Sequence, residues 1–537
     1  MVIKKDVRED GCGCALRAGG KRWRGLLVLV ALLVTVATGP AAAKTDSAAA
    51  SFDFEAVARA AEALAAEPFR APAANLPEAL ERLGYDDYRK IRFKRDAALW
   101  RGKALFEVQL FHLGFLYTTP VRINVVRDGR AQLVAYRPEM FDLGGLALPE
   151  RPAESMGFAG FRVHFPLHTP DYKDEVAVFL GASYFRVLGR GQRFGASARG
   201  LAIDTGEPKG EEFPLFREFW LVEPGPEDTD LTFYALLDSP SLTGAYAFRL
   251  HPGTETVTQV RARVFLRQDV KKLGIAPLTS MFLYGENRTR RFDDHRPEVH
   301  DSDGLLMDTG AGERLWRPLS NPGDLRVSAF VDARPRGFGL MQRDRAYDRY
   351  LDLEARYDLR PSLWVESLGD WGEGHVELVE IPSKQEINDN IVAYWRPKQE
   401  MKAGARLDVA YRLSARSDGP PPPYVGRAVR TRIGAAAVPG SPDPLPPEVR
   451  LFVIDFAGGD MPYLGEAQPV RAVVRHSAGR LVDVVTQRSP EDGHWRVAFR
   501  LDTSGTEAID LMVHLELRGR RLTETWSGLW TPDLFGS

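Results

Sequence analysis

LTFYALLDSPSLTGAYAFRLHPGTETVTQVRARVFL, residues 231–266, is the stretch of the chain that decides the fold. It predicts strands at 231–236, 246–250 and 257–265, because each segment is short, rich in Phe, Tyr, Val and Leu, and bounded by turn residues. No helix-length periodic segment alternates with these strands, which disfavours a parallel βαβ architecture. We therefore expect large antiparallel sandwich sheets, to which similar segments contribute at 105–111, 121–126, 176–180, 217–222 and 375–380.

Two short helices are expected before the strands. Residues 54–66 are rich in Ala, place Val57 and Leu64 on one face, and are followed by Pro68. Residues 76–83 carry a proline in the first turn and end at Gly84, which is typical of a helix end. The predicted class is therefore all-β with two short N-terminal helices.

A proline run divides the chain. Pro420 to Pro423 cannot join a sheet ladder and act as a stiff spacer. After it, strands are predicted at 449–456, 472–476, 495–501 and 510–517, a spacing that suits an immunoglobulin-like β-sandwich. The expected domains are a large β-sandwich at 51–416, which binds substrate, and an immunoglobulin-like domain at 424–537.

The N-terminus is predicted to be a secretory signal, residues 1–43. Seven basic residues precede an apolar stretch at 26–37, and three alanines end at Ala43. Twelve apolar residues are too few to span a bilayer of about 30 Å, although a retained N-terminal anchor is the alternative. Removing this segment removes both cysteines, Cys12 and Cys14, and with them any thiolate metal site or cysteine nucleophile.

Charge and motifs exclude several classes of function. The 537 residues hold 71 basic and 73 acidic side chains, so no basic footprint for nucleic acid is present. The chain has neither a Walker A motif nor a Gly-x-Ser-x-Gly elbow. His295 and His300 are five residues apart, but the sequence indicates no third ligand, so no metal and no cofactor are expected.

Two acidic segments suggest sugar chemistry. The segment RFDDHRPEVHDSDGLLMDTG spans 291–310, and Glu386-Ile-Asn-Asp-Asn lies directly before a strand-like run. Paired carboxylates cleave glycosidic bonds when one protonates the leaving oxygen and the other activates water. Trp316, Tyr357 and Trp364 lie in the same third of the chain and offer rings for stacking on pyranoses, while Arg317 offers donors to hydroxyls. The alternative reading is a solvated acidic loop and core tryptophans.

Ten ordered blocks carry a resemblance to a known family. Among them are LGASYFRVLGRGQRFGASARGLAIDT (180–205), KLGIAPLTSMFLYGEN (272–287), RPEVHDSDGL (296–305) and NDNIVAYWRP (388–397). From residue 51 to beyond 395, and more weakly to the C-terminus, the chain resembles the osmoregulated periplasmic glucan biosynthesis proteins, the G and D members. The resemblance implies a galactose-mutarotase-like β-supersandwich followed by an immunoglobulin-like β-sandwich. It also implies a periplasmic location and action on a β-1,2-glucan backbone, in some members as an anomer-inverting endo-β-1,2-glucanase.

Carried over residue by residue, the resemblance implies Asp389 as the general acid and Asp301 as the general base, which acts through a relay that includes a substrate hydroxyl. Beside these two, the substrate-binding candidates are His300, Arg317, Trp316, Tyr357, Trp364, Tyr394 and Trp395.

Two alternatives remain open. One is a non-catalytic periplasmic factor that binds glucan and guides chains from a membrane glucosyltransferase. The other is a mutarotase-like epimerase acting on free sugars. The sequence leaves the oligomeric state open.

Overall fold

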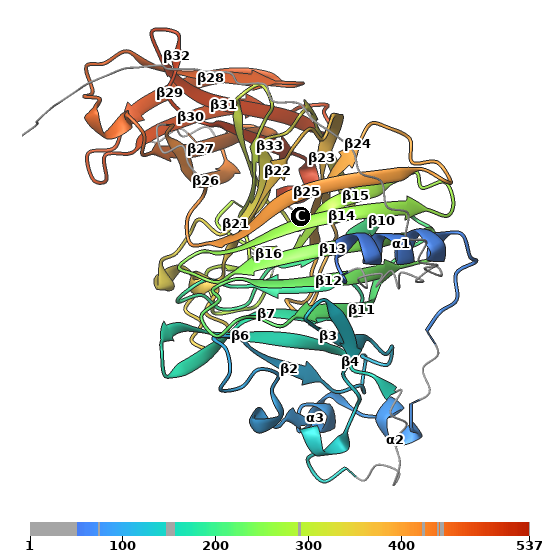
Figure 1. Ribbon diagram of the computed structural model, residues 1–537. Helices are drawn as coiled ribbons and strands as arrows, with labels where there is room; N and C mark the ends of the chain where they lie inside the picture. The colour runs from blue at the N-terminus through green and yellow to red at the C-terminus, as the bar shows by residue number, and fades with distance from the viewer. Residues whose placement is uncertain are drawn as a thin grey trace, which may run out of the picture. The chain divides into compact units, whose positions relative to one another are not determined.

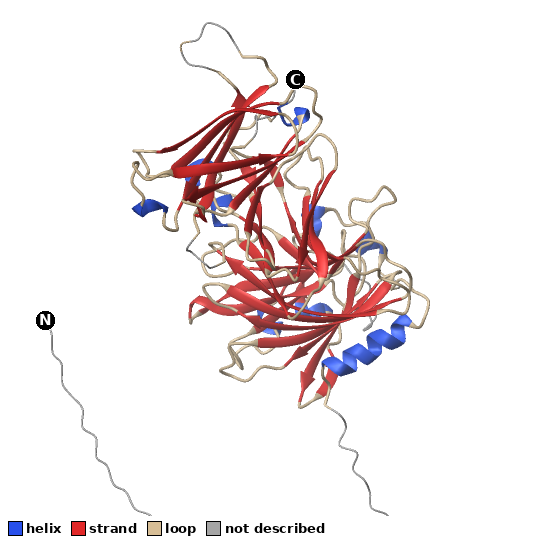
Figure 2. Cartoon of the chain, turned by 90° about the horizontal axis from the view of Figure 1, so that it is seen from above, coloured by secondary structure: helices blue, strands red, loops and turns tan. Residues whose placement is uncertain are grey.

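The structure, a computed structural model, describes residues 51–535 except 73–75, 147–155, 288–291, 421–424, 438–439 and 441–444. The predicted signal and most of the proline run therefore lie outside the described residues. Ser51–Ser537 form one compact unit, of which the described part is mostly β-sheet, with 49% strand and 8% helix. The prediction of an all-β sandwich fold is confirmed (Figure 2).

The N-terminal helices are short. Helix α1 (Phe54–Ala65) begins at Asp53, whose carboxylate accepts the N–H of Ala56 at 3.0 Å, and it buries Phe54 and Val57. It packs on β12 and β13 of the larger sheet (Figure 1). The second predicted helix, 76–83, is shorter than expected, at α2 (Glu78–Glu81), and α3 (Tyr85–Tyr88) follows it.

One large sheet has ten strands. Its order is β2-β6-β7-β8-β9-β15-β24-β23-β20, and β10 pairs with β15 beside that path. The strands are β2 (Glu107–Phe111), β6 (Gly160–Thr169), β7 (Tyr172–Leu180), β8 (Tyr184–Val187), β9 (Ser197–Arg199), β10 (Leu201–Ile203), β15 (Leu273–Ser280), β20 (Arg326–Ala333), β23 (Glu373–Glu380) and β24 (Ile391–Pro397).

The second large sheet has fifteen strands. Its order is β28-β31-β33-β19-β18-β21-β22-β25-β14-β13-β12-β11-β3-β4, with β32 beside β31. The strands are β3 (Arg122–Arg127), β4 (Arg130–Leu133), β11 (Leu215–Val222), β12 (Leu231–Asp238), β13 (Leu242–His251), β14 (Thr256–Leu266), β18 (Gly304–Asp308), β19 (Arg314–Pro318), β21 (Gly337–Met341), β22 (Ser362–Leu368), β25 (Arg406–Arg416), β28 (Val470–His476), β31 (Ile509–Leu517), β32 (Arg520–Arg521) and β33 (Thr525–Trp530).

Phenylalanines join the two large sheets into a sandwich. Phe161 and Phe179, from the ten-stranded sheet, stack with ring centroids 5.0 Å apart. Phe179 meets Phe233 of the fifteen-stranded sheet edge-on at 5.1 Å, and Phe233 stacks on Phe248 at 5.0 Å. All four side chains are at most 2% exposed, so the rings of the two inner faces fill the space between the layers.

The C-terminal residues add a smaller sheet but also extend the larger one. The order β26-β27-β30-β29 joins β26 (Arg427–Ala435), β27 (Val449–Ala457), β30 (Trp495–Asp502) and β29 (Arg480–Arg488). Strand β33 pairs in parallel with β19, which places Trp526 opposite Trp316. Strands from both sides of the proline run share one sheet, so the strand pairing does not divide the chain there. The domain bounds 51–416 and 424–537 stay a prediction.

Two short pairs complete the described strands: β1 (Arg92–Phe93) with β5 (Phe141–Asp142), and β16 (Phe282–Tyr284) with β17 (Val299–His300). Across the described ranges, no helix is both long and apolar enough to cross a membrane.

Candidate active site

The segment that joins β15 to β16 anchors both predicted catalytic loops. Asp301 follows β17 directly, and its N–H donates to the carbonyl of Met281 at 2.8 Å. The side chain of Ser302 pairs with that of Ser280 at 2.9 Å, so the loop is fixed on both sides of the bend at Met281.

Asp389 is fixed to the next residue of the same segment. Its neighbour Asn390 is buried, accepts the N–H of Phe282 at 2.8 Å and donates to the Phe282 carbonyl at 3.0 Å. A third bond from Asn390 reaches the carbonyl of Ile381 at 3.0 Å. The two candidate carboxylates are thus fastened to consecutive residues of one strand segment, although 88 residues separate them in sequence.

Asp301 occupies a desolvated position. Its side chain belongs to a residue only 7% exposed, and Oδ1 makes no hydrogen bond among the described residues. Arg360 lies beside it, with Nε 3.5 Å from Oδ1. Burial raises the pKa of Asp301 to about 6, Arg360 opposes that shift, and the negative charge of Asp389 adds to it. The two carboxyl groups therefore influence each other's ionisation.

Asp389 lies on an exposed loop, yet protein crowds one side of its carboxyl group. Desolvation there raises the pKa of Asp389, while the charges of Arg186 and Arg199 oppose the rise. Arg186 also lowers the pKa of Asp301. Neighbouring strands β8 and β9 hold both arginines: Arg186 donates to Ser197 at 2.8 Å, and Arg199 to Thr279 at 2.8 Å. These strands thus carry the cationic side of the site.

Tyr357 and Glu386 connect the two loops further. The hydroxyl of Tyr357 donates to Glu386 Oε2 at 3.2 Å, and the guanidinium of Arg360 lies 5.1 Å from the Tyr357 ring centroid. Burial raises the pKa of Tyr357 to values at which it stays protonated, and the charges of Glu386 and Asp301 add to the rise. Arg296 binds the same Glu386 oxygen at 2.8 Å, so the loop that carries Asp389 is tied to the acidic segment.

His300, the residue before Asp301, supports the site and is fully buried. Its Nε2 lies 3.0 Å from Glu298 and its Nδ1 2.9 Å from Gln342, and the ring is fully buried against Phe282. Gln342 also donates to the carbonyl of His300 at 2.9 Å and to that of Tyr357 at 3.1 Å. The predicted substrate contact of His300 is corrected to a positioning role, because no face of its ring is free.

The structure buries five of the other predicted substrate-binding residues away from solvent. Trp316 and Trp364 are 4% and 5% exposed and pack in the core cluster shared with the C-terminal strands. Tyr394 and Trp395 are fully buried, and Arg317 is 5% exposed. A ring enclosed by protein cannot stack on a sugar, so the four aromatic residues are corrected to core positions, whereas the predicted role of Arg317 as a donor stays a prediction.

Other residues beside Asp389 went unpredicted. Arg199 lies 4.6 Å from the ring centroid of Tyr184 and 5.5 Å from that of Phe213, which is 50% exposed. Arg186, Arg199 and Tyr184 stand in the block 180–205, but a lone arginine or tyrosine in a strand carries no signal of its own. Arg360 is likewise far from Asp301 in sequence, and only the folded chain brings the two side chains together.

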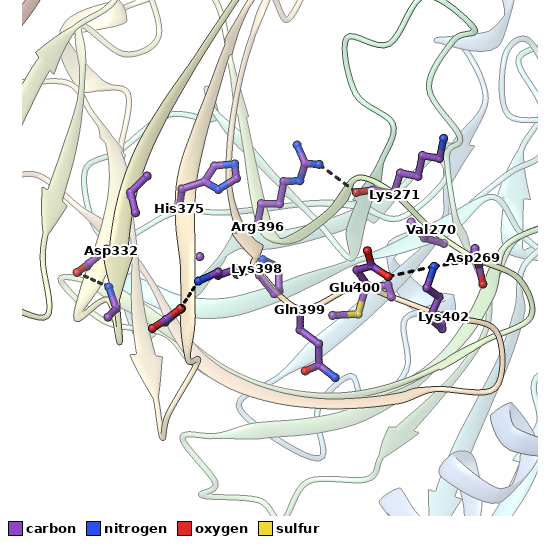
Figure 3. Close-up of a pocket in the computed structure, with 16 residues that line it drawn as sticks. Asp269, Val270, Lys271, Asp332, His375, Arg396, Lys398, Gln399, Glu400 and Lys402 are labelled. Atoms are coloured by element: carbon purple, nitrogen blue, oxygen red, sulfur yellow. Dashed lines mark hydrogen bonds and ion pairs between the residues drawn. The ribbon is translucent and has the colours of Figure 1, made fainter.

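A separate cavity of about 1010 Å³ lies at the far end of β24 (Figure 3). Its charges are largely paired: Lys398 binds Glu373 at 2.7 Å, and Lys402 binds Asp269 at 3.2 Å. Neither Asp301 nor Asp389 lines it. In the part of the chain that the structure describes, no three His, Asp or Glu side chains are grouped to hold a metal ion.

Comparison with known proteins shows the family of the chain. The family described as "Periplasmic glucan biosynthesis protein, MdoG" matches residues 52–530. Glucans biosynthesis protein G of Rhodopseudomonas palustris (strain BisA53) is 47% identical, over 94% of this chain and 99% of its own length. The proteins of that name from Bradyrhizobium diazoefficiens and Ralstonia nicotianae are 46% and 47% identical, over 92% and 93% of this chain and 96% and 99% of their own lengths. With a family match over nearly its whole described length, the chain belongs to the periplasmic glucan biosynthesis protein MdoG family.

Proposed function

We propose that this protein acts in the periplasm in glucan biosynthesis, as an anomer-inverting endo-β-1,2-glucanase that shortens or sizes the glucan backbone. The observation that carries the proposal is the pair of carboxyl groups of Asp301 and Asp389. The backbone of Asp301 is bonded to Met281, and Asn390, next to Asp389, is bonded to Phe282. Each carboxyl group has a raised pKa, which the charges of nearby arginines oppose. Such a pair is what hydrolysis with inversion requires.

Asp389 is the general acid. Protonated, it donates to the glycosidic oxygen as the bond from that oxygen to the anomeric carbon breaks. Desolvation already raises its pKa, and a polysaccharide laid over this exposed loop would remove more water and raise the pKa further. Substrate binding thus favours the protonated form that the step needs.

Asp301 is the general base. With a pKa of about 6 it is mostly ionised at neutral pH, and it is a stronger base than an ordinary aspartate. It takes a proton from the water whose oxygen attacks the anomeric carbon from the opposite face. Oδ1 makes no hydrogen bond to protein in the described residues but is buried beside Arg360, so the proton reaches it through a relay that includes a substrate hydroxyl.

The neighbouring side chains suit a neutral, hydroxyl-rich chain. Tyr184, on which the charge of Asp389 acts, and Phe213, an exposed residue beside Arg199, offer rings, and Arg186 offers donors to hydroxyl groups. In the periplasm, the substrate would be glucan that leaves a membrane glucosyltransferase.

The test incubates the mature protein with linear β-1,2-glucan and follows the products and their anomeric configuration. We expect short β-1,2-glucans released as the α-anomer, and a loss of about 10²–10⁴-fold in kcat for Asp389→Asn and for Asp301→Asn. Asp348→Asn, which changes an exposed acid of the same region, serves as the control and should keep full activity. Binding without turnover, unchanged in both variants, would instead identify a factor that guides glucan chains.

A further inference from the structure

Strand β20 (Arg326–Ala333) forms an open edge of the ten-stranded sheet. Among the described residues it pairs only with β23, on one side. Both ends are fastened: Arg326 binds Thr531 and Asp533, and the carboxylate of Asp332 accepts the N–H of Gly310 at 2.9 Å. Between these ends, residues 327–331 present a straight backbone edge.

The direction of the backbone groups follows from the pairing. At the end of β20, the N–H of Arg334 donates to the carbonyl of Gly372, the residue just before β23. Antiparallel strands alternate residues that bond to one neighbour with residues that face the other side. The even-numbered residues therefore bond to β23, and Val327, Ala329 and Val331 direct their N–H and C=O groups to the open edge.

The middle of this edge lacks the usual protection. Natural sheets prevent edge pairing with charged side chains, proline or a bulge, and 327–331 contains none of these. Val327 and Val331 are instead 47% and 84% exposed, and Ala329 between them is exposed too. An open edge with an apolar outer face is a template for another strand.

The exposed residues of β20 match each other in one register. If two copies pair antiparallel with Ala329 opposite Ala329, Val327 faces Val331 on both sides of the axis. Arg326 then lies opposite Asp332, although Arg326 already binds Asp533 and Asp332 already binds Gly310 within one chain. The Arg326 and Asp332 positions are then non-hydrogen-bonded pairs, in which side chains approach closest. Registers centred on Arg326 or on Asp332 would place like charges face to face.

We propose that β20 is the interface of a two-fold dimer, in which a second copy of this chain adds its own β20 antiparallel across Ala329. Val327, Ala329 and Val331 of each copy then exchange six backbone hydrogen bonds, and their side chains lie next to those of the other copy on one face of the joined sheet. Such an isologous contact closes on itself and forms no filament. The cavity of Figure 3, whose wall includes Asp332, borders this interface in both copies.

The test measures the mass of the mature protein in solution by light scattering over a dilution series. The expected result is twice the mass of one chain, falling to one on dilution. The double variant Val327→Lys, Val331→Lys places a lysine of one copy opposite a lysine of the other in this register. It should therefore give the mass of a single chain. Val327→Lys with Val331→Asp opposes unlike charges and should restore the dimer, which no general loss of folding would do.

A cysteine checks the register independently. Ala329→Cys introduces the only cysteine after residue 14, and hydrogen-bonded antiparallel partners lie about 5.5 Å apart between Cα atoms, within reach of a disulfide. Mild oxidation should cross-link two chains, while Tyr463→Cys, an exposed site elsewhere, should not cross-link. A single-chain mass at every concentration, a dimer that survives both lysines, or no cross-link at residue 329 would each overturn the proposal.

Discussion

The side chain amide of Asn390 pairs with both backbone groups of Phe282, accepting its N–H at 2.8 Å and donating to its carbonyl at 3.0 Å. One amide thus satisfies both backbone groups of Phe282, the residue of β16 opposite His300 of β17, and it sets the position of Asp389 one residue earlier. The same segment holds Asp301 through the carbonyl of Met281. The relative placement of the two carboxyl groups therefore depends on a side chain that performs no chemistry.

Asn390→Ala should lower kcat far more than it changes KM. The change leaves the N–H and C=O of Phe282 without partners, at a cost of about 1–3 kcal/mol in the free energy of unfolding. It also loosens the loop that carries the acid, and displacement of a catalytic group by 1 Å costs about 10²-fold in rate. Kinetics and thermal melting of Asn388→Ala, an exposed neighbour on the same loop, provide the control. A normal kcat in Asn390→Ala would contradict the anchoring role.

Asp301→Asn should lose activity and gain stability. A carboxyl group with a pKa of 3.8 unfolded and about 6 folded binds more protons when folded, so the stability of the wild type falls as pH rises from about 4 to about 6. At about 1.36 kcal/mol per pKa unit the cost approaches about 3 kcal/mol above pH 6. Denaturant unfolding at pH 4 and pH 7 measures it, and the variant should lack this pH dependence.

Arg360→Gln should move the acidic limb of the pH dependence of kcat/KM to higher pH. The positive charge of Arg360 lowers the pKa of Asp301, so its removal allows that pKa to rise above about 6. Arg360→Lys keeps the charge and should leave the limb near its original position. If the limb is equally placed in both variants, Asp301 is not the base that the profile reports.

Trp364→Ala should destabilise the protein by about 3–5 kcal/mol without changing KM for glucan. Its ring is 5% exposed and lies in the core cluster that includes Trp316 and Trp526. Unfolding by denaturant and saturation kinetics on the folded fraction separate the two effects. A raised KM with unchanged stability would return Trp364 to the substrate-binding surface.

Phe213→Ala should raise KM and leave kcat and stability unchanged. Half of this residue is exposed, and its ring lies beside Arg199 near Asp389. Loss of one stacking contact costs about 0.5–1.5 kcal/mol of binding, or about 2–10-fold in KM. Tyr463→Ala, which removes a ring that is 88% exposed, is the matched control and should leave KM unaltered.

The all-β class could be predicted from sequence because the strand pattern is local, and α1 because its alanine content and apolar face are local too. The prediction of sugar-binding rings was wrong for the opposite reason, because burial of a ring depends on the whole fold and not on local sequence. A tryptophan looks the same in sequence whether its ring faces a groove or, like Trp395, the core. Arg360, just before β22, and Arg186, on β8, are far from Asp301 in sequence, and only the folded chain brings their charges to it.

The pairing of β33 with β19 has a consequence for how the molecule is made. Thr525 and Trp526 pair with Leu315 and Trp316, which lie more than 200 residues earlier in the chain. Contacts of such long sequence separation form slowly. If the chain emerges from an export channel N-terminus first, β19 has no β33 to pair with until the C-terminal residues appear. The sheet can then be completed only when synthesis and translocation are complete.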